Sequence, residues 1–291
     1  MPPSVLDVLR KSAAYLAAKG VPEARLDAEL LVARALNCDR LALYLAFDRP
    51  LAETELAACR AAIRRRARRE PVQHILGDQA FRALTLEVTA DTLVPRPETE
   101  EVVDHVLAEV DRLMTAGVAA PALLDLGTGS GCIALAVATE RPAARVTAVD
   151  QSAAALAVAR RNAVRAGASV RFLQGDWYAP LEAAERFHLI VSNPPYLTPV
   201  EWEAAQPEVR DFEPRAALVG GDDGLDAYRH ILEDAPARLH PGGGVVVEIG
   251  HTQGEAVAAI ARRAGFDDVR RERDMEGRER AVIARGAVRG G

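Results

Sequence analysis

The chain has 291 residues, 49% of them hydrophobic and 27% charged, so it can bury a substantial core and is not expected to be disordered. This length suggests one large domain or two ordinary ones. The formal net charge of −6 argues against broad electrostatic binding to nucleic acid, which needs a basic surface to displace counterions.

Cysteine and histidine usage gives no sign of a disulfide framework or a metal site. The three cysteines, Cys38, Cys59 and Cys132, are odd in number and far apart, and the six histidines are scattered. We therefore expect reduced thiols, a reducing compartment and no bound metal. No apolar run reaches the roughly 20 residues that cross a bilayer, and the first residues lack the layout of a signal peptide. The expected location is the cytoplasm, with no membrane partner.

Residues 1–73 have the pattern of a small helical domain. Ser4 and Asp7 are spaced for a capping box at the start of a first helix, and further helical stretches follow, the last ending at Pro71. This region is also basic: residues 1–75 carry 13 Lys or Arg against 9 Asp or Glu, a net charge of +4, which leaves −10 for the remainder.

A run of arginines lies near the end of this domain, at Arg64, Arg65, Arg66, Arg68 and Arg69. Charge runs are usually solvated helix faces, and we interpret this one in that way. Contact with RNA or with an acidic partner is the alternative.

Residues 74–94 change from helical to alternating periodicity. Apolar side chains recur at Leu84, Leu86 and Val88, and the turn-forming stretch "TADT" follows them. The pattern predicts a β-hairpin that links the helical domain to residues 95–291.

The remainder of the chain begins with a loop and a helix and then alternates strands with helices. The strand-like stretches are "ALLDL", "RVTAVD", "VRFLQGD", "FHLIVSN" and "GGGVVVEIG", with two closing strands near "DVRRERD" and "RAVIAR". Helical stretches lie between them, which is typical of parallel βαβ units with helices on both faces of one sheet. The predicted fold class is α/β.

The turn after the first of these strands carries glycines in the spacing GxGxG, at Gly127, Gly129 and Gly131, preceded by Asp125. Glycines there allow a tight turn and let a ligand approach the backbone closely. The spacing is neither the phosphate-binding GxxxxGK[ST] nor the dinucleotide-binding GxGxxG. Asp150 ends the next strand, where a carboxylate can accept hydrogen bonds from ribose hydroxyls.

This combination of strand, acidic residue, glycine loop, helix, strand and second acidic residue resembles the S-adenosylmethionine site of class I, Rossmann-like methyltransferases. The resemblance implies that the loop and Asp150 bind this cofactor. The stretch "GDWY" follows the next strand, where such folds hold groups beside the adenine. Trp177 is therefore predicted to pack on the purine and Asp176 to meet its polar edge. A buried core aromatic is the alternative role of Trp177.

A rigid polar corner, formed by Asn193, Pro194, Pro195 and Tyr196, follows the strand "FHLIVS". Its form, [DNS]PP[YFW], resembles the motif of methyltransferases that act on planar NH₂ groups. The side-chain oxygen of Asn193 and the carbonyl of Pro194 can accept hydrogen bonds from such a group, and Tyr196 can lie against its flat π system. The prolines hold both acceptors in place, which limits the entropy lost on binding. We predict catalytic roles for Asn193 and Tyr196.

Longer stretches, in order through most of the chain, narrow the comparison: "PVQHILGDQAF", "LVPRPETEEVV", "FEPRAALVGGDDGLDAYRHI" and "EIGHTQG". Together with the glycine loop and NPPY they resemble the PrmC/HemK family, the protein-(glutamine-N5) methyltransferases of class I peptide chain release factors. The resemblance implies methyl transfer from S-adenosylmethionine to the glutamine of the GGQ loop, with S-adenosylhomocysteine as product. The helical domain would help to hold the release factor.

The same resemblance implies which residues meet each ligand. Cofactor contacts are expected from Gly127, Thr128, Gly129, Ser130, Gly131, Asp150, Trp177 and Asn193. Substrate contacts are expected from Asn193, Pro194, Pro195 and Tyr196. Arg96, Glu98 and Thr99 are expected near the active site, without an assigned role.

Three alternatives stay open at the level of sequence. A sister family methylates a glutamine of a large-subunit ribosomal protein, but its pattern differs at "FEPRAAL" and "EIGHTQ". Methyltransferases of nucleic-acid amino groups share NPPY, but the acidic balance of residues beyond 75 argues against the basic channel that they need. A non-enzymatic, cofactor-binding module would not need the NPPY corner.

Overall fold

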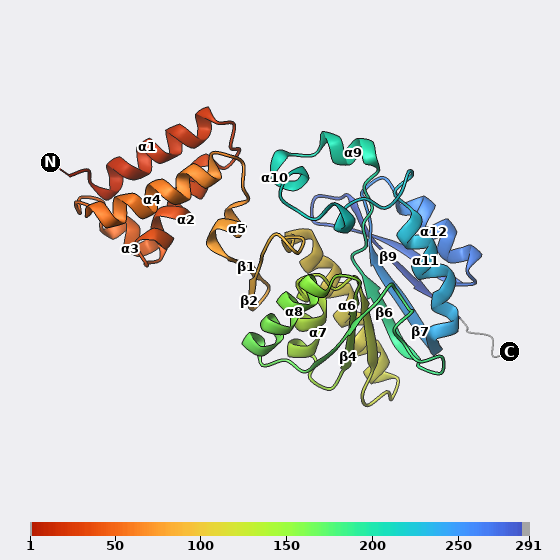
Figure 1. Cartoon of the computed structure of the whole chain (residues 1–291). Coiled ribbons are helices and arrows are strands. Elements are labelled where there is room, and N and C mark those ends of the chain that lie inside the picture. The colour runs from red at the N-terminus through yellow and green to blue at the C-terminus, as the bar shows by residue number, and fades with distance from the viewer. Residues whose placement is uncertain (1, 287–291) are drawn as a thin grey trace. The chain divides into compact units, whose positions relative to one another are not determined.

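The computed structural model of the chain describes residues 2–286 and divides into two compact units (Figure 1). A helical unit holds the residues up to Asp78 together with Gln206–Phe212. A sheet unit holds Gln79–Ala205 and the residues from Glu213 onward. The return of Gln206–Phe212 to the first unit is not visible in the sequence pattern.

The helical unit combines helices of the amino-terminal region with a short helix from far along the chain. They are α1 Val5–Ala18, α2 Ala24–Ala35, α3 Arg40–Leu45, α4 Glu53–Arg66, α5 Val72–Leu76 and α10 Pro207–Arg210. The predicted capping box is confirmed, because the Asp7 N–H donates to Ser4 Oγ over 3.3 Å and the Ser4 N–H donates to the Asp7 carboxylate over 3.1 Å. Apolar side chains of α1, α2 and α4, among them Leu16, Leu31 and Ile63, form its core.

The arginine run of α4 is not a uniformly solvated face, so that interpretation is wrong for two of its members. Arg66 is only 4% exposed, and its guanidinium donates to Asp27 of α2 over 2.6 Å. The same guanidinium donates to Glu208 of α10 over 2.8 Å, and Arg69 donates to both carboxylate oxygens of Glu208 over 2.6 Å. Sequence periodicity could not reveal this, because Glu208 lies 142 residues from Arg66.

A two-stranded hairpin opens the sheet unit, with β1 at Asp78–Phe81 and β2 at Leu84–Glu87. The hairpin is confirmed, but its turn is misplaced in the prediction: "TADT" follows the second strand, and the chain turns at Arg82, whose φ is 51°. Arginine carries no turn signal. Its guanidinium instead holds the turn by donating to Glu140 over 2.5 Å and to Asp104 over 2.7 Å. The expected start of the hairpin is occupied by α5.

A seven-stranded mixed sheet forms the centre of the sheet unit, in the order β5-β4-β3-β6-β7-β9-β8. Its strands are β3 Ala122–Leu126, β4 Arg145–Asp150, β5 Val170–Gln174, β6 Phe187–Ser192, β7 Leu239–Glu248, β8 Asp268–Arg273 and β9 Glu279–Arg285. Strands β3 to β7 pair in parallel, whereas β9 pairs antiparallel with both β7 and β8. The predicted α/β class is confirmed.

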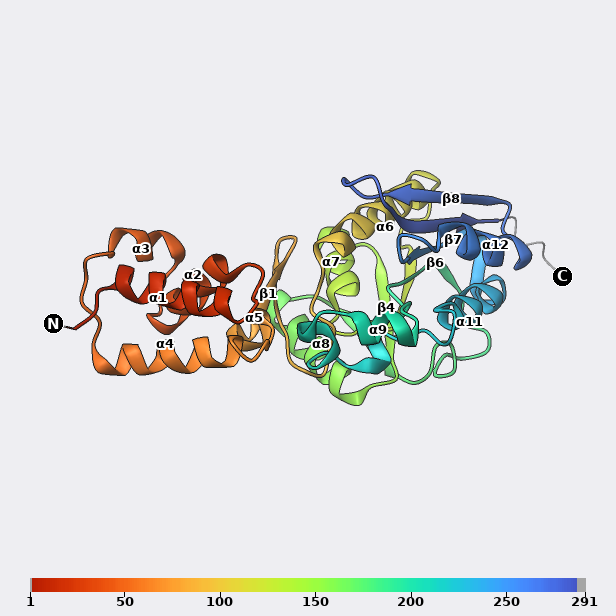
Figure 2. The same cartoon turned by 90° about the horizontal axis from the view of Figure 1, so that it is seen from above.

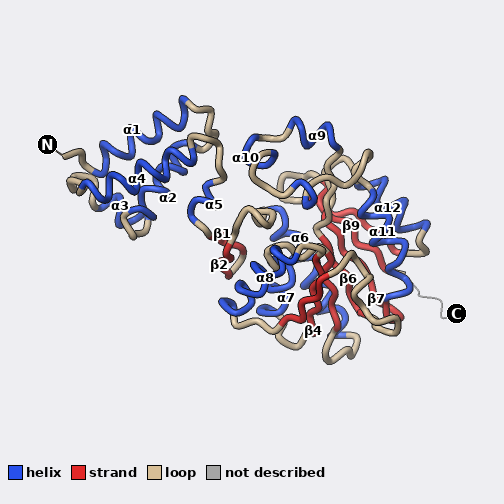
Figure 3. Tube along the Cα trace, in the orientation of Figure 1, coloured by secondary structure: helices blue, strands red, loops and turns tan. Residues whose placement is uncertain are grey.

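Helices cover both faces of this sheet (Figure 1 and Figure 2). One core cluster packs α6 Pro97–Thr115, α7 Cys132–Glu140 and α8 Ala153–Ala166 on one face, and the other packs α11 Asp226–Asp234 and α12 Gly254–Arg263 on the opposite face. Successive residues of β3 point to opposite clusters, since Leu123 belongs to the first and Leu124 to the second. Strands buried on both faces explain the continuous apolar runs of the sequence. The short helix α9, Pro199–Ala204, lies outside these layers in the loop after β6 (Figure 3).

The strand order reverses between β3 and β6, because the chain proceeds from β3 outward through β4 and β5 and then returns to pair β6 with β3. Ligands of open α/β sheets bind outside the carboxyl ends of the strands at such a switch point. The glycine loop follows β3 and the NPPY corner follows β6. The topology therefore brings the two predicted motifs to one edge of the sheet.

Within residues 2–286, no helix is long and apolar enough to cross a bilayer, and no group of three or more His, Cys, Asp and Glu side chains is arranged to hold a metal ion.

Candidate functional site

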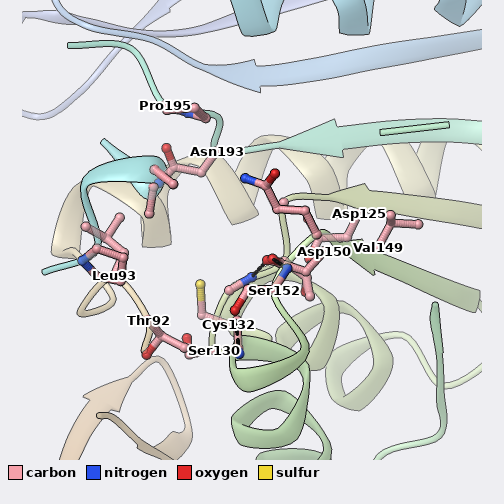
Figure 4. A pocket seen from close by; sticks show the side chains of 18 of the residues that line it. Thr92, Leu93, Asp125, Ser130, Cys132, Val149, Asp150, Ser152, Asn193 and Pro195 are labelled. Atoms are coloured by element: carbon pink, nitrogen blue, oxygen red, sulfur yellow. Dashed lines mark hydrogen bonds between the residues drawn. The ribbon is translucent and has the colours of Figure 1, made fainter. Parts of the chain in front are cut away.

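A cavity of about 340 Å³ lies at the switch point, within the size range of small-molecule sites (Figure 4). Its wall combines the glycine loop, the ends of β4 and β6, and the segment that leads from the hairpin into α6. Among the residues that line the cavity are Thr92, Arg96, Thr99, Asp125, Gly127, Thr128, Gly129, Ser130, Asp150, Trp177, Asn193 and Pro195.

The glycine loop is held against β4 by its own backbone. The N–H groups of Gly127 and Thr128 both donate to the carbonyl of Val149, over 2.9 and 3.0 Å. Gly127 and Gly129 have φ values of 71° and 56°, in the left-handed region that favours glycine. Gly131 has φ 87°, and a Cβ there would lie 3.1 Å from the side chain of Leu135 in α7. The sequence spacing thus reflects a backbone shape that other residues would strain.

Asp150 links this loop to the end of β4. One of its carboxylate oxygens accepts from the Gly129 N–H and the other from the Ser152 N–H, each over 2.8 Å (Figure 4). Burial raises the pKa of Asp150, and these two backbone bonds oppose that rise. Each oxygen retains a second lone pair, so the carboxylate is held rigid and can still accept hydrogen bonds from a ligand.

Asp125 is the second acidic residue of the cavity, and it is 1% exposed. Its Oδ2 accepts from the hydroxyl of Thr128 over 2.7 Å, whereas its Oδ1 has no hydrogen-bond partner among the described residues. Burial raises the pKa of Asp125 to about 7, and the Thr128 bond and the nearby backbone N–H of Ala134 oppose that rise. A buried oxygen left without a donor in a cavity wall is suited to a ligand that brings a donor or a positive charge.

The amide of Asn193 is oriented by two further residues. Its Nδ2 donates to the hydroxyl of Thr99 over 3.2 Å, and that hydroxyl donates to the carboxylate of Glu248 over 2.7 Å. Thr99 and Glu248 are each 1% exposed. Burial raises the pKa of Glu248 to about 7. With its nitrogen engaged, Asn193 keeps its Oδ1 as a free acceptor in a residue that lines the cavity.

The NPPY corner is supported from behind by the stretches "GGDDG" and "HTQ". The amide of Gln253 donates to the carbonyl of Tyr196 over 2.9 Å and to that of Gly224 over 3.3 Å. A Cβ on Gly220 or Gly224 would lie 2.3 Å from the carbonyl oxygen of Pro195 or Tyr196, respectively. Glycine is therefore required at both positions for the close approach of the two backbones.

The stretches "PRPETE" and "FEPRAAL", far apart in the chain, meet through one ion pair. Arg96 donates to the carboxylate of Glu213 over 2.5 Å, and the Val94 N–H donates to the same carboxylate over 3.1 Å. Glu213 is 6% exposed. Arg96 and Thr99, which had no predicted role, therefore belong to the wall of the cavity, and Thr99 contacts Asn193 directly.

Most of the predicted site residues meet at the cavity, and three do not line it. Those that line it are Gly127, Thr128, Gly129, Ser130, Asp150, Trp177, Asn193 and Pro195. Gly131 and Pro194 are buried behind it, and Tyr196 is half-buried against the core cluster of α11 and α12. Trp177 lines the cavity and also packs against that same cluster, so its contact with a purine stays a prediction.

The sequence reasoning missed three contributors, all of them polar and fully buried. Thr92 is 1% exposed, lines the cavity and has a hydroxyl without a hydrogen-bond partner among the described residues. Glu248 stands behind Thr99, and Asp125 was noted only as a residue preceding the glycines. A polar residue in an apolar strand, such as Glu248 after "GVVV", was the one available signal.

Known proteins match the chain over almost its whole length. The sequence profile of the PrmC N-terminal domain matches residues 7–77, and that of the methyltransferase small domain matches residues 107–207. The chain is 48% identical over 282 residues to a release factor glutamine methyltransferase of Geobacter sulfurreducens, which covers 97% of this chain and 96% of that one. It is 46% identical over 281 residues to the protein of the same name from Cereibacter sphaeroides, which covers 96% of this chain and 97% of that one.

A solved structure shares the fold at lower identity. The methyltransferase from Pyrococcus furiosus is 21% identical and superposes with a TM-score of 0.50, over 72% of this chain and 91% of that one.

Proposed function

The chain belongs to the family of release factor glutamine methyltransferases, and on that premise we propose that it methylates N5 of the glutamine in the GGQ loop of class I peptide chain release factors. The methyl donor of the family is S-adenosylmethionine. The observation that carries the proposal is the Asn193 amide, which is held through its nitrogen and keeps its oxygen as an acceptor in the cavity wall. A carboxamide NH₂ is the group that such an acceptor fits.

The residues of the cavity fit S-adenosylmethionine. The unpartnered Oδ1 of Asp125 suits a positively charged group of this cofactor, and the carboxylate of Asp150 suits its ribose hydroxyls. Trp177, on the wall after β5, suits the flat face of adenine. We assign the glycine loop, from Gly127 to Gly131, the role of letting the cofactor approach the backbone.

The chemistry requires alignment more than acid or base catalysis. When bound, the cofactor supplies a methyl carbon made electrophilic by the adjacent sulfonium. The lone pair of an amide nitrogen is delocalised, so acceptors on its hydrogens are needed to direct that lone pair outward. We assign the Asn193 Oδ1 and the Pro194 carbonyl to this task. The cofactor would supply the methyl group and would leave as S-adenosylhomocysteine with the electron pair of the C–S bond, and the methylated glutamine nitrogen would lose one proton. Holding the reacting atoms in line and displacing water from them would supply most of the effect.

The role of Tyr196 stays a prediction. Its ring is half-buried beside α11 and α12, and its carbonyl is held by Gln253. We propose that the ring shapes the corner and reaches the substrate amide only when a release factor is bound.

Because the proposed substrate is a protein of translation, we also place the enzyme in the cytoplasm and infer that the basic helical unit helps to hold the release factor.

The test is transfer of labelled methyl from S-adenosylmethionine to a purified release factor. We expect labelling of the wild-type factor and none of a factor whose GGQ glutamine is replaced by alanine. The variant Asn193→Ala should still bind the cofactor measurably while its kcat falls by about 10²- to 10³-fold, the size of losing one oriented group of the transition state. Labelling of a ribosomal protein or of nucleic acid instead would overturn the proposal.

A further inference from the structure

We propose that Glu248 and Thr99 are positioning residues for methyl transfer, which act by deciding which end of the Asn193 amide meets the substrate. The inference rests on the proposed function, because it concerns the same acceptor oxygen. Neither residue lies at the reacting atoms. Each acts through the hydrogen bond that it makes to the next.

The three residues come from adjacent elements that meet behind the cavity. Glu248 ends β7, and Asn193 follows Ser192, the last residue of β6, which pairs with Val247 of β7. Thr99 lies in the first turn of α6, where its side chain stands between the other two. Neighbouring parallel strands keep a fixed register, so the sheet holds Asn193 and Glu248 close together, and the packing of α6 places Thr99 3.2 and 2.7 Å from them.

Glu248 decides which groups donate and which accept in this series of hydrogen bonds. An ionised carboxylate only accepts hydrogen bonds, so the single hydrogen of the Thr99 hydroxyl is committed to Glu248. The hydroxyl oxygen can then only accept, and the Asn193 side chain must present its NH₂ to it. The amide oxygen is thereby directed away from Thr99 and toward the cavity. The two ends of an asparagine amide have nearly the same shape, so packing alone would not make this distinction.

The charge environment supports an ionised Glu248 at mildly alkaline pH. Burial raises the pKa of Glu248 to about 7, the hydrogen bond from Thr99 opposes that rise, and the charge of Arg280 opposes it as well. Glu98 raises this pKa further and Arg96 lowers it. At pH 8 the carboxylate is therefore the main form, and the chain has the polarity described above.

Loss of these two hydrogen bonds should leave the side-chain amide of Asn193 free to rotate by 180°. With no acceptor beyond it, or with no hydroxyl, the NH₂ end can face the cavity and meet the NH₂ of the substrate glutamine. Two donors cannot bond to each other, so the fraction of productively oriented complexes falls. The cofactor contacts assigned to Asp125, Asp150 and Trp177 do not involve this chain.

The experiment compares Thr99→Val with Thr99→Ser at pH 8, in transfer of labelled methyl to a release factor. Valine has the shape of threonine without its hydroxyl, and we expect kcat to fall by about 10- to 100-fold, as for loss of a supporting hydrogen-bond partner at other sites. The cofactor Kd should change by less than about three-fold, since the binding groups are untouched. Serine keeps the hydroxyl and should restore kcat. The variant Glu248→Leu should reproduce the loss, and the Thr99 pair decides the outcome if that variant fails to fold.

A second comparison separates positioning from a general structural role. In the background Asn193→Asp the two carboxylate oxygens are equivalent, so orientation no longer matters. There, Thr99→Val should cost less than about three-fold in kcat, whereas equal losses in both backgrounds would overturn the inference, because interacting sites are non-additive and independent ones are additive. A folded Thr99→Val enzyme with wild-type kcat would overturn it as well. If the wild-type enzyme itself does not methylate a release factor, it is the proposed function that fails.

Discussion

Two buried clusters of acidic residues differ in what balances their charge. Under α4 in the helical unit, Asp27 and Glu208 accept from the guanidinium of Arg66, and Arg69 completes the bonding of Glu208. In the sheet unit, Asp125 in the cavity wall and Glu248 behind Thr99 accept from hydroxyls and form no ion pair within the described part of the chain.

The difference separates a structural use of buried charge from a functional one. Burial alone would raise the pKa of Glu208, but Arg69 and Arg66 outweigh it and the pKa is lowered, so this carboxylate stays ionised and paired. At Asp27, which shares Arg66, burial outweighs the hydrogen bond and raises the pKa. Asp125 and Glu248 have pKa values raised to about 7. Carboxylates whose pKa is raised to about 7, in or beside a cavity, are typical of functional sites, where a bound ligand can balance their charge.

The largest effect should follow from breaking the paired cluster. The variant Arg66→Met leaves the buried carboxylate of Asp27 without its cation and leaves Glu208 paired with Arg69 alone, and we expect the free energy of unfolding to fall by about 3–5 kcal/mol. Urea unfolding followed by far-ultraviolet circular dichroism measures the loss. The matched control is Arg60→Met on the same helix, whose side chain and partner Glu53 are 55% and 77% exposed, and it should change stability by less than about 0.5 kcal/mol. Equal losses of unfolding free energy in the two variants would show that the buried ion pairs stabilise the fold no more than an exposed pair does.

For the carboxylate of Asp125, which has no ion-pair partner among the described residues, we expect substitution to raise the free energy of unfolding rather than lower it. Its folded-state pKa of about 7 lies above the usual value of 3.8, so the folded protein keeps a proton that the unfolded chain loses. Stability without ligand therefore falls as pH rises from about 4 to 7 and then levels off. The variant Asp125→Asn should be indistinguishable from wild type below pH 4 and more stable at pH 8, by at most about 4 kcal/mol.

The same variant should weaken cofactor binding, measured by calorimetry at pH 8, because the neutral amide cannot balance a positive charge. Wild-type affinity should rise through pH 7 as Asp125 ionises, and that rise should vanish in Asp125→Asn. An Asp125→Asn protein that is less stable than wild type at pH 8 would contradict the contrast between the clusters.

A smaller effect concerns Trp177, which belongs to both the cavity and a core cluster. Stacking of a base on an aromatic side chain contributes about 1–3 kcal/mol, so Trp177→Ala should weaken cofactor binding by about 5- to 150-fold. The variant Trp177→Phe keeps an aromatic face and should recover most of the affinity. If Trp177→Ala lowers the free energy of unfolding and leaves the Kd unaltered, the residue belongs to the core alone.

Local signals were sufficient for most of the elements and for the two motifs of the site. Each of these signals depends on only a few neighbouring residues: the apolar runs of β3, β4 and β6, the capping box at Ser4 and the GxGxG spacing. Their physical basis is short-range, since strands buried on both faces need continuous apolar runs and left-handed turns need glycine. The Arg82 turn was missed because an arginine in that conformation carries no such signal.

What the amino-acid sequence alone determined was the α/β class, the cofactor loop, the NPPY corner and, through longer motifs, the family. Only the tertiary structure decided that Arg66 is buried against Asp27 and Glu208, and that Thr99 and Glu248 stand behind Asn193. The reason is separation along the chain: Thr99 and Glu248 lie 149 residues apart, and they become neighbours only when β7 and α6 pack together. Hydrogen bonds of this kind depend on the register of the sheet, which no local pattern records.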